Sequence, residues 1–153
     1  MLEVLMKTLI IYDSLYGNTE KVAQAIKGAL TGEVIMQRMT EANLAELQPG
    51  DLLIIGSPTQ GGTSTKVTQE FLKNITGDNL KNIRVGVFDT RLTQKMVGIF
   101  GYAAGKIGDI LKKKGVSLVG NPVGFYVKGS KGPLKEGELE RVTDWVKNLN
   151  TSR

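Results

Sequence analysis

The chain has 153 residues, of which 41% are hydrophobic and 23% are charged, a composition typical of a globular protein with a sizeable apolar core. It contains no cysteine and no histidine, which excludes disulfides, thiolate nucleophiles, iron–sulfur clusters, imidazole bases and the usual zinc sites. The 20 basic and 15 acidic residues give a net charge of +5, an excess that favours an acidic protein partner, nucleic acid or an anionic membrane.

The first seven residues have no basic start and only a short apolar run. They predict neither a signal peptide nor a membrane span, so we expect a cytoplasmic protein without stable membrane insertion. The lysines at 112–114 end a predicted helix, where cations suit the helix dipole. Because no basic stripe interleaved with aromatic residues occurs, we expect no nucleic-acid partner. We further expect one domain over residues 1–153, a monomer, and no metal site.

The first strand is predicted over residues 7–13 and the first helix over 19–30. Between them, Ser14, Asn18 and Thr19 offer side-chain donors, and Gly17 allows a close backbone approach. A loop of this kind before a helix N-terminus is suited to a phosphate group. The alternative is an ordinary turn in which Asn18 or Thr19 caps the helix. Neither the Walker pattern nor the dinucleotide Gly-x-Gly-x-x-Gly fingerprint is present.

Four more strands are predicted over residues 33–39, 51–56, 82–88 and 117–127, with a helical turn at 43–47. Further helices are expected around 67–75 and 103–111 and over 136–149, the last of which should bury Leu139 and Trp145. The alternation and the nearly continuous apolar strands predict an α/β protein with a doubly wound, five-stranded parallel sheet ordered 2-1-3-4-5. The first and last helices should share one face. Residues 51–56 should lie near the centre, and Pro122 favours an edge position for the fifth strand.

In such a sheet, ligands bind beyond the carboxyl ends of the strands, where the order reverses. Two further unusual segments fall there. Residues 56–63 combine Pro58, which stiffens the chain, with the permissive pair Gly61 and Gly62. Residues 88–91 read Phe-Asp-Thr-Arg and open a long connection to residue 101. We therefore expect three loops to meet around one crevice.

This combination resembles the flavodoxin family over nearly the whole chain. The resemblance rests on Tyr-Asp-Ser-Leu-Tyr-Gly-Asn-Thr-Glu at 12–20 and Gly-Ser-Pro-Thr-Gln-Gly-Gly at 56–62. Residues 88–91 and 124–141 are similar to a less-studied subgroup, and the fifth strand lacks the insertion of long-chain members. The resemblance implies that FMN is the cofactor. It implies as cofactor-binding residues Ser14, Leu15, Tyr16, Gly17, Asn18, Thr19, Pro58, Thr59, Gln60, Gly61, Gly62, Asp89, Thr90, Arg91 and Phe100.

The resemblance implies an electron-transfer protein that cycles its flavin through oxidised, semiquinone and hydroquinone states. A peptide flip at Gln60–Gly61 or Gly61–Gly62 would turn a carbonyl toward the flavin N5–H. The alternative is an FMN-dependent NAD(P)H:quinone-type oxidoreductase, with residues 96–100 as the wall of a substrate pocket. A phosphate-switched receiver domain is excluded, because Asp13 stands alone and the third strand ends in Gly-Ser.

Two features depart from well-known flavodoxins. No aromatic residue occurs in residues 57–64, which leaves Tyr16, Phe100 or Tyr102 to stack on the flavin. The chain is also basic, with a pI near 9.4, and Arg91, Lys95 and Lys66 are expected near the flavin. We therefore expect redox partner proteins with an acidic docking face. The alternative is that the excess charge is scattered over the back helices.

Overall fold

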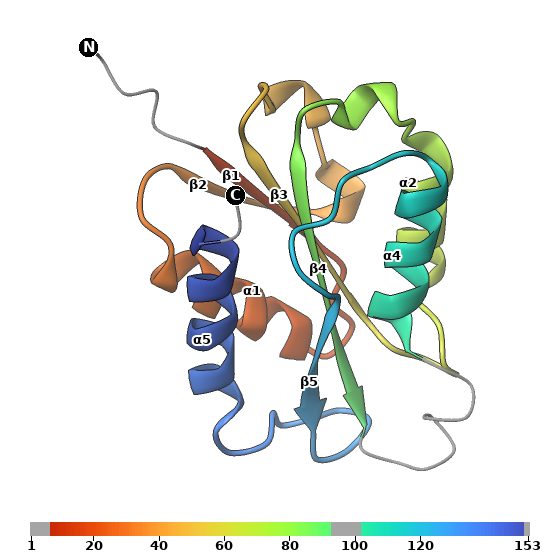
Figure 1. Cartoon of the computed structure of the whole chain (residues 1–153). Coiled ribbons are helices and arrows are strands. Elements are labelled where there is room, and N and C mark those ends of the chain that lie inside the picture. The colour runs from red at the N-terminus through yellow and green to blue at the C-terminus, as the bar shows by residue number, and fades with distance from the viewer. Residues whose placement is uncertain (1–6, 93–101, 152–153) are drawn as a thin grey trace.

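The computed structural model describes residues 7–92 and 102–151, and its centre is a parallel sheet in the order β2-β1-β3-β4-β5 (Figure 1). The strands are β1 (Thr8–Tyr12), β2 (Val34–Arg38), β3 (Leu52–Pro58), β4 (Arg84–Leu92) and β5 (Val123–Val127). The register pairs Ile10 with Met36 on one side and with Ile54 on the other. The predicted fold class and strand order are confirmed.

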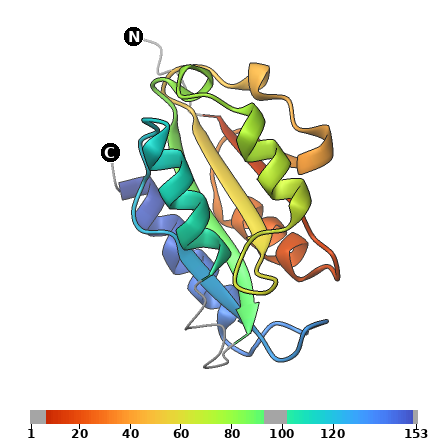
Figure 2. The ribbon, with the colours of Figure 1, turned by 90° about the vertical axis from the view of Figure 1, so that its right-hand side faces the viewer.

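Helices cover both faces of this sheet, which gives three layers (Figure 2). They are α1 (Asn18–Ala29), α2 (Lys66–Asn74), α4 (Ala103–Lys113) and α5 (Glu138–Thr151). The short 3-10 turns η1 (Met39–Glu41), η2 (Leu44–Glu46) and η3 (Asp78–Leu80) lie in the connections. Helices α1 and α5 share one face and α2 and α4 the other, as right-handed crossovers require.

The strands are continuous apolar runs because both faces of the sheet are buried. Every residue of β1 is buried, and β3 is buried from Leu52 to Ser57. Alternate residues of β1 pack into the cores on opposite faces of the sheet. Leu9 packs with α2 and α4, whereas Ile10 packs with α1 and α5. The predicted central position of the third strand is confirmed.

The fourth strand is longer than the sequence predicts. We expected a strand over 82–88 followed by a loop, but β4 continues to Leu92, so Asp89, Thr90 and Arg91 are strand residues. The extension forms because Thr90 pairs with Pro58 of β3 and with Phe125 of β5. Side chains that the sequence suggests for a loop are therefore held at fixed positions on the rigid end of a strand.

The fifth strand is shorter than predicted and begins only after Pro122, at Val123. Its edge position is confirmed. The carboxylate of Glu138 accepts a hydrogen bond from the Tyr126 N–H at 2.7 Å, and Arg141 donates to the carbonyl of Gly124 at 3.2 Å. The first turn of α5 thus satisfies backbone groups that an edge strand would otherwise expose.

The helices agree with the sequence except at their borders. Trp145 is in the core, with ring centroids 6.1 Å from both Phe88 and Phe125, as predicted. Leu139, which we expected to be buried, is 50% exposed, because α5 begins at Glu138 and Leu139 faces away from the sheet. In the described residues, no helix has the length and apolar character needed to cross a membrane.

Candidate functional site

A pocket of about 280 Å³ lies beyond the carboxyl ends of the strands. Segments that follow β1, β3 and β5, together with the end of β4, surround it. The lining residues are Ser14, Leu15, Tyr16, Asn18, Thr19, Pro58, Thr59, Gln60, Gly61, Thr90, Arg91, Leu92, Val127 and Ser130. The three segments singled out in the sequence therefore meet at one place.

The N-terminus of α1 forms one side of this pocket. Gly17 precedes the helix with φ of +91°, in the left-handed region that favours glycine. The Ser14 hydroxyl accepts hydrogen bonds from the N–H groups of Gly17 at 3.1 Å and Glu20 at 3.4 Å. Within the described part of the chain, the N–H groups of Asn18 and Thr19 have no hydrogen-bond partner. The helix thus presents two donors and its positive dipole end to the pocket.

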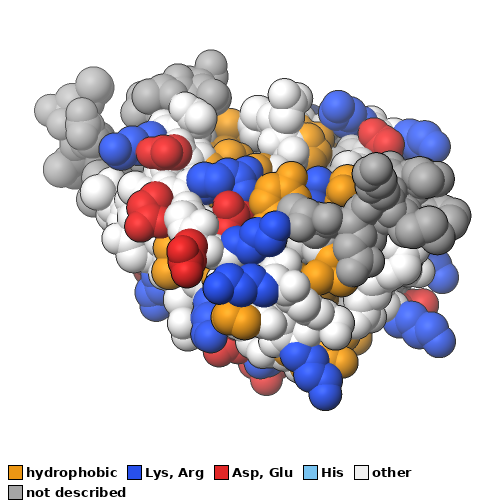
Figure 3. All heavy atoms as spheres, turned by 90° about the horizontal axis from the view of Figure 1, so that it is seen from below, with side chains coloured by type: hydrophobic (Ala, Val, Ile, Leu, Met, Phe, Trp, Pro, Cys, Tyr) orange, Lys and Arg blue, Asp and Glu red, His pale blue; other side chains and the backbone are white. Residues whose placement is uncertain are grey.

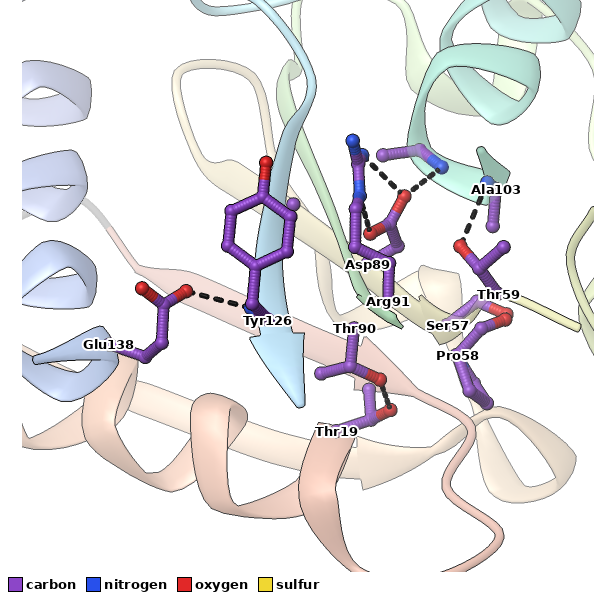
Figure 4. Close-up of polar contacts among 12 residues, drawn as sticks. Thr19, Ser57, Pro58, Thr59, Asp89, Thr90, Arg91, Ala103, Tyr126 and Glu138 are labelled. Atoms are coloured by element: carbon purple, nitrogen blue, oxygen red, sulfur yellow. Dashed lines mark hydrogen bonds and ion pairs between the residues drawn. The ribbon is translucent and has the colours of Figure 1, made fainter. Parts of the chain in front are cut away.

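Neutral side chains complete this side. The hydroxyls of Thr19 and Thr90 lie 2.8 Å apart, which joins α1 to the end of β4 (Figure 4). Asn18 is buried against Gly132, a position where any side chain would collide with the Asn18 amide. The segment after β5 is therefore packed directly onto the first turn of α1.

One carboxylate lies near this helix end. Glu20 is in the first turn of α1, where its negative charge would disfavour an anion in the pocket. Its Oε1 atom lies 2.9 Å from Nη2 of Arg38 and accepts a hydrogen bond from the Tyr12 hydroxyl at 3.2 Å. The Arg38 charge compensates that of Glu20, so the first turn of α1 carries little net charge.

A tight turn over Gln60–Thr63 forms another wall. Gly61 and Gly62 have φ of +57° and +80°, the backbone of a type I′ turn. Gln60 and Thr63 exchange both of their backbone hydrogen bonds, at 2.8 and 3.1 Å. The peptide between the two glycines lies outside these hydrogen bonds, so it can rotate without breaking them.

Asp89 and Arg91 form a buried ion pair beside the pocket. The guanidinium of Arg91 donates to both carboxylate oxygens of Asp89, with Nε–Oδ1 at 2.7 Å and Nη2–Oδ2 at 2.8 Å. Asp89 is fully buried and Arg91 is only 14% exposed. The guanidinium also stacks on the Tyr102 ring, 3.6 Å from its centroid. The Arg91 charge is therefore largely neutralised and held in one orientation.

The same carboxylate closes the N-terminus of α4. Asp89 Oδ2 accepts a hydrogen bond from the Ala104 N–H at 2.8 Å, and the Thr59 hydroxyl accepts one from the Ala103 N–H at 3.0 Å (Figure 4). Burial raises the pKa of Asp89, and its hydrogen bonds to Arg91 and Ala104 oppose that rise. The first donors of α4 are thus used within the protein.

The structure brings most of the residues named from the sequence to this pocket. Gly17, Gly62 and Asp89 do not line it: Gly17 shapes the first loop, Gly62 is in the type I′ turn, and Asp89 lies behind Arg91. Phe100 and Lys95 fall outside the described residues, as does the run 96–100. Lys66 lines a separate groove between α2 and η1.

Sequence reasoning missed three lining residues: Leu92, Val127 and Ser130. Leu92 was not expected to line the pocket because the fourth strand was predicted to end at residue 88, whereas β4 continues to Leu92. Val127 and Ser130 belong to the end of β5 and the segment after it. The run Lys128-Gly-Ser-Lys-Gly-Pro133 was the available signal, since small residues after a strand at this end of the sheet resemble the other pocket loops.

This donor set fits FMN. A phosphate ester requires donors, and the pocket offers the two unpaired N–H groups of Asn18 and Thr19 together with neighbouring hydroxyls. Leu92, Val127 and Pro58 supply apolar surface for a ring system. Small-molecule pockets combine such apolar walls with a few polar groups that fix orientation.

Comparisons with known proteins point to one family. Residues 10–145 match the family model described as flavodoxin. A flavodoxin from Aquifex aeolicus is 37% identical over 76 residues, which cover 47% of this chain and 41% of that protein. A flavodoxin from Maridesulfovibrio salexigens is 28% identical over 125 residues, 75% of this chain and 82% of that protein. The crystal structure of oxidised Flavodoxin 2 from Bacillus cereus is 29% identical with a TM-score of 0.72, covering 94% of this chain and 97% of that one.

Proposed function

The chain belongs to the flavodoxin family and is an FMN-binding, flavodoxin-like electron-transfer protein, and we propose that its FMN occupies the pocket described above. The observation that carries the proposal is the open N-terminus of α1, which faces a pocket whose polar lining, apart from Arg91, is uncharged. When bound, FMN supplies the electron transfer, since the chain contains no cysteine and its described residues include no cluster of potential metal ligands.

In this proposal the phosphate of FMN binds at α1. The N–H groups of Asn18 and Thr19 donate to it, and the hydroxyls of Ser14, Thr19 and Thr90 lie within the same pocket. No lysine or arginine of the first loop takes part, because residues 13–19 contain none. The binding energy comes from hydrogen bonds and from the helix dipole.

We propose that Pro58, Thr59, Gln60 and Gly61 contact the ring system. The two backbone hydrogen bonds between Gln60 and Thr63 argue against a flip of the Gln60–Gly61 peptide, because that flip would remove the Gln60 carbonyl from the Thr63 N–H. Rotation of the Gly61–Gly62 peptide converts a type I′ turn into type II′ and preserves both bonds. The Gly61 carbonyl is therefore the acceptor we assign to a ring N–H.

We propose an acidic redox partner that docks beside the pocket. Leu15 and Tyr16 are 51% and 53% exposed at its rim, and Lys131 Nζ lies 5.9 Å from the centroid of the Tyr16 ring. Lys128 and Lys135 belong to the same segment after β5. Figure 3, which views this end of the molecule, shows Lys and Arg side chains around hydrophobic ones near the centre, with Asp and Glu side chains to their left. A face of this kind suits carboxylates placed around an apolar contact.

The carrier role is tested by adding FMN to the purified protein and then reducing it. We expect stoichiometric binding, seen as the visible absorption bands of protein-bound flavin, and slow oxidation of NADH or NADPH in the presence of a quinone when no reductase is added. A colourless protein after FMN addition would contradict the proposed pocket. Rapid turnover without a reductase would contradict the carrier role. The cytoplasmic location and the monomeric state stay predictions.

A further inference from the structure

A chain of buried hydroxyl groups lies beneath the pocket and joins its two walls. The Thr65 hydroxyl donates to the Asp13 carboxylate at 2.6 Å and lies 3.0 Å from the Thr68 hydroxyl. Thr68 donates to the Ser57 hydroxyl at 3.1 Å, and Ser57 donates to the carbonyl of Pro58 at 3.0 Å. Asp13 opens the first loop, and Pro58 lines the pocket.

The protonation pattern divides this chain into two directed branches. Each hydroxyl carries a single proton and can accept at its lone pairs. The proton of Thr65 points to Asp13 and therefore to the loop before α1. The single proton of Thr68 is shared between the hydroxyls of Thr65 at 3.0 Å and Ser57 at 3.1 Å, and the proton of Ser57 points to Pro58. The first turn of α2 is thus the branch point between the two loops.

Helix formation alone explains only part of this cluster. Thr65 is the N-cap of α2, where its hydroxyl accepts a hydrogen bond from the Thr68 N–H, a role that threonine favours. The Thr68 side chain has no such role. It is fully buried inside a helix, a position where a valine of the same shape would avoid the burial of a polar group. Ser57 is fully buried as well.

We propose that Thr68 and Ser57 are positioning residues that hold the Pro58 wall of the pocket in register with the loop before α1. The inference rests on the proposed function, because it assigns these residues to the FMN pocket. Neither residue lines the pocket, so each acts through the segment it holds. Loss of the Thr68 hydroxyl leaves Ser57 with only the longer hydrogen bond from the Thr65 N–H, at 3.4 Å, and weakens the link between α2 and the segment that begins at Pro58.

The test compares Thr68→Val, which removes the hydroxyl but keeps the shape, with Thr68→Ser, which keeps the hydroxyl. Riboflavin and inorganic phosphate are the probes, because riboflavin reports on the ring wall and phosphate on the N-terminus of α1. We expect riboflavin to bind Thr68→Val about tenfold more weakly, the effect of one buried hydrogen bond. Phosphate affinity should stay within about twofold, and Thr68→Ser should restore riboflavin binding.

A matched control separates positioning from general destabilisation. Val146→Ala removes buried core volume in α5, away from the hydroxyl chain, and should lower the melting temperature without changing riboflavin affinity. Riboflavin binding to Thr68→Val that equals wild type would overturn the inference. If Thr68→Val does not fold, Ser57→Ala tests the same chain and should show the same selective loss. A wild-type protein that binds neither riboflavin nor FMN would overturn the proposed function itself.

Discussion

Helices α1 and α4 begin at the same end of the sheet, yet their N-termini are built in opposite ways. At α1, the N–H groups of Asn18 and Thr19 lack partners within the described residues. At α4, the N–H groups of Ala103 and Ala104 are taken by Thr59 and Asp89. Both helices expose donors and a positive dipole end by the same geometry. The side chains that reach these donors from neighbouring strands make the difference.

The contrast explains why, of these two helices, only α1 has backbone donors available for an anion. Helix α4 already has an internal anion, the buried carboxylate of Asp89, and Arg91 balances its charge. Helix α1 has neutral donors, and the charge of the carboxylate in its first turn, Glu20, is compensated by Arg38. The N-terminus of α4 is therefore bonded within the protein, whereas the N-terminus of α1 is left available for a ligand. Substitutions can disrupt each of the two N-termini separately.

The largest effect is expected at the N-terminus of α4, the closed end, from Arg91→Met. The substitution leaves Asp89 buried without its cation, and removing one partner of such a pair costs about 3 kcal/mol. Because burial raises the pKa of Asp89 and Arg91 opposes that rise, the folded-state pKa in the variant lies further above its unfolded value. The decrease in the free energy of unfolding is therefore complete at pH values above that pKa. It becomes smaller as pH falls through the pKa, because the Asp89 carboxylate is then protonated and neutral.

Urea unfolding of Arg91→Met and wild type from acidic to neutral pH measures this dependence. The control is Lys73→Met, which breaks the exposed pair with Glu70 and should change stability by less than about 1 kcal/mol at every pH. An Arg91→Met variant as stable as wild type at neutral pH would show that the pair does not hold the closed end.

The open end is tested by Gly17→Ala, with Gly115→Ala as its control. Both glycines have positive φ, +91° and +82°, and an added Cβ meets nothing within 4 Å at either site. Each alanine should therefore cost about 1 kcal/mol of backbone strain. Gly115 ends α4 far from the pocket, with a backbone hydrogen bond from Val116 to Leu111 closing the turn, so only Gly17→Ala should also weaken FMN binding.

Isothermal titration with FMN distinguishes the two variants. We expect about a tenfold loss of affinity for Gly17→Ala, because strain at Gly17 shifts the donors of Asn18 and Thr19. Affinity of Gly115→Ala should match wild type. Equal affinities in both variants would mean that the open end of α1 does not hold the cofactor.

The open end was readable from the sequence, and the closed end was not. Ser14, Gly17 and Asn18 lie close together in the sequence, so their residue types alone indicate a loop before a helix. The strand order also follows from local patterns, since five apolar runs and their spacing leave few arrangements. The closed end joins residues far apart in the chain, such as Thr59 with Ala103 and Asp89 with Ala104. Local periodicity carries no information on such contacts.

The extension of β4 was missed for a related reason. Asp89 and Arg91 are charged, and charged residues after an apolar run normally indicate the end of a strand. Here each neutralises the other, and the Arg91 side chain lies over Gly124 of β5, where a side chain would collide with the guanidinium. The strand continues because two polar residues and one glycine fit together, which a single sequence does not reveal.

The smallest effect is expected at the rim, outside both helix ends. Lys131→Gln removes a positive charge near Tyr16, and one charge about 10 Å from a redox group in near-aqueous surroundings contributes roughly 0.4 kcal/mol. A positive charge favours the more negative reduced cofactor, so its loss should lower the midpoint potential of bound FMN by about 20 mV. Lys113→Gln, the same change in the last turn of α4, should leave the potential unchanged.

Reduction of ferricyanide, an anionic acceptor, should slow with added salt in wild type and less so in Lys131→Gln. A rate that does not depend on salt in either protein would contradict the proposed acidic partner, whereas the contrast between α1 and α4 would still hold.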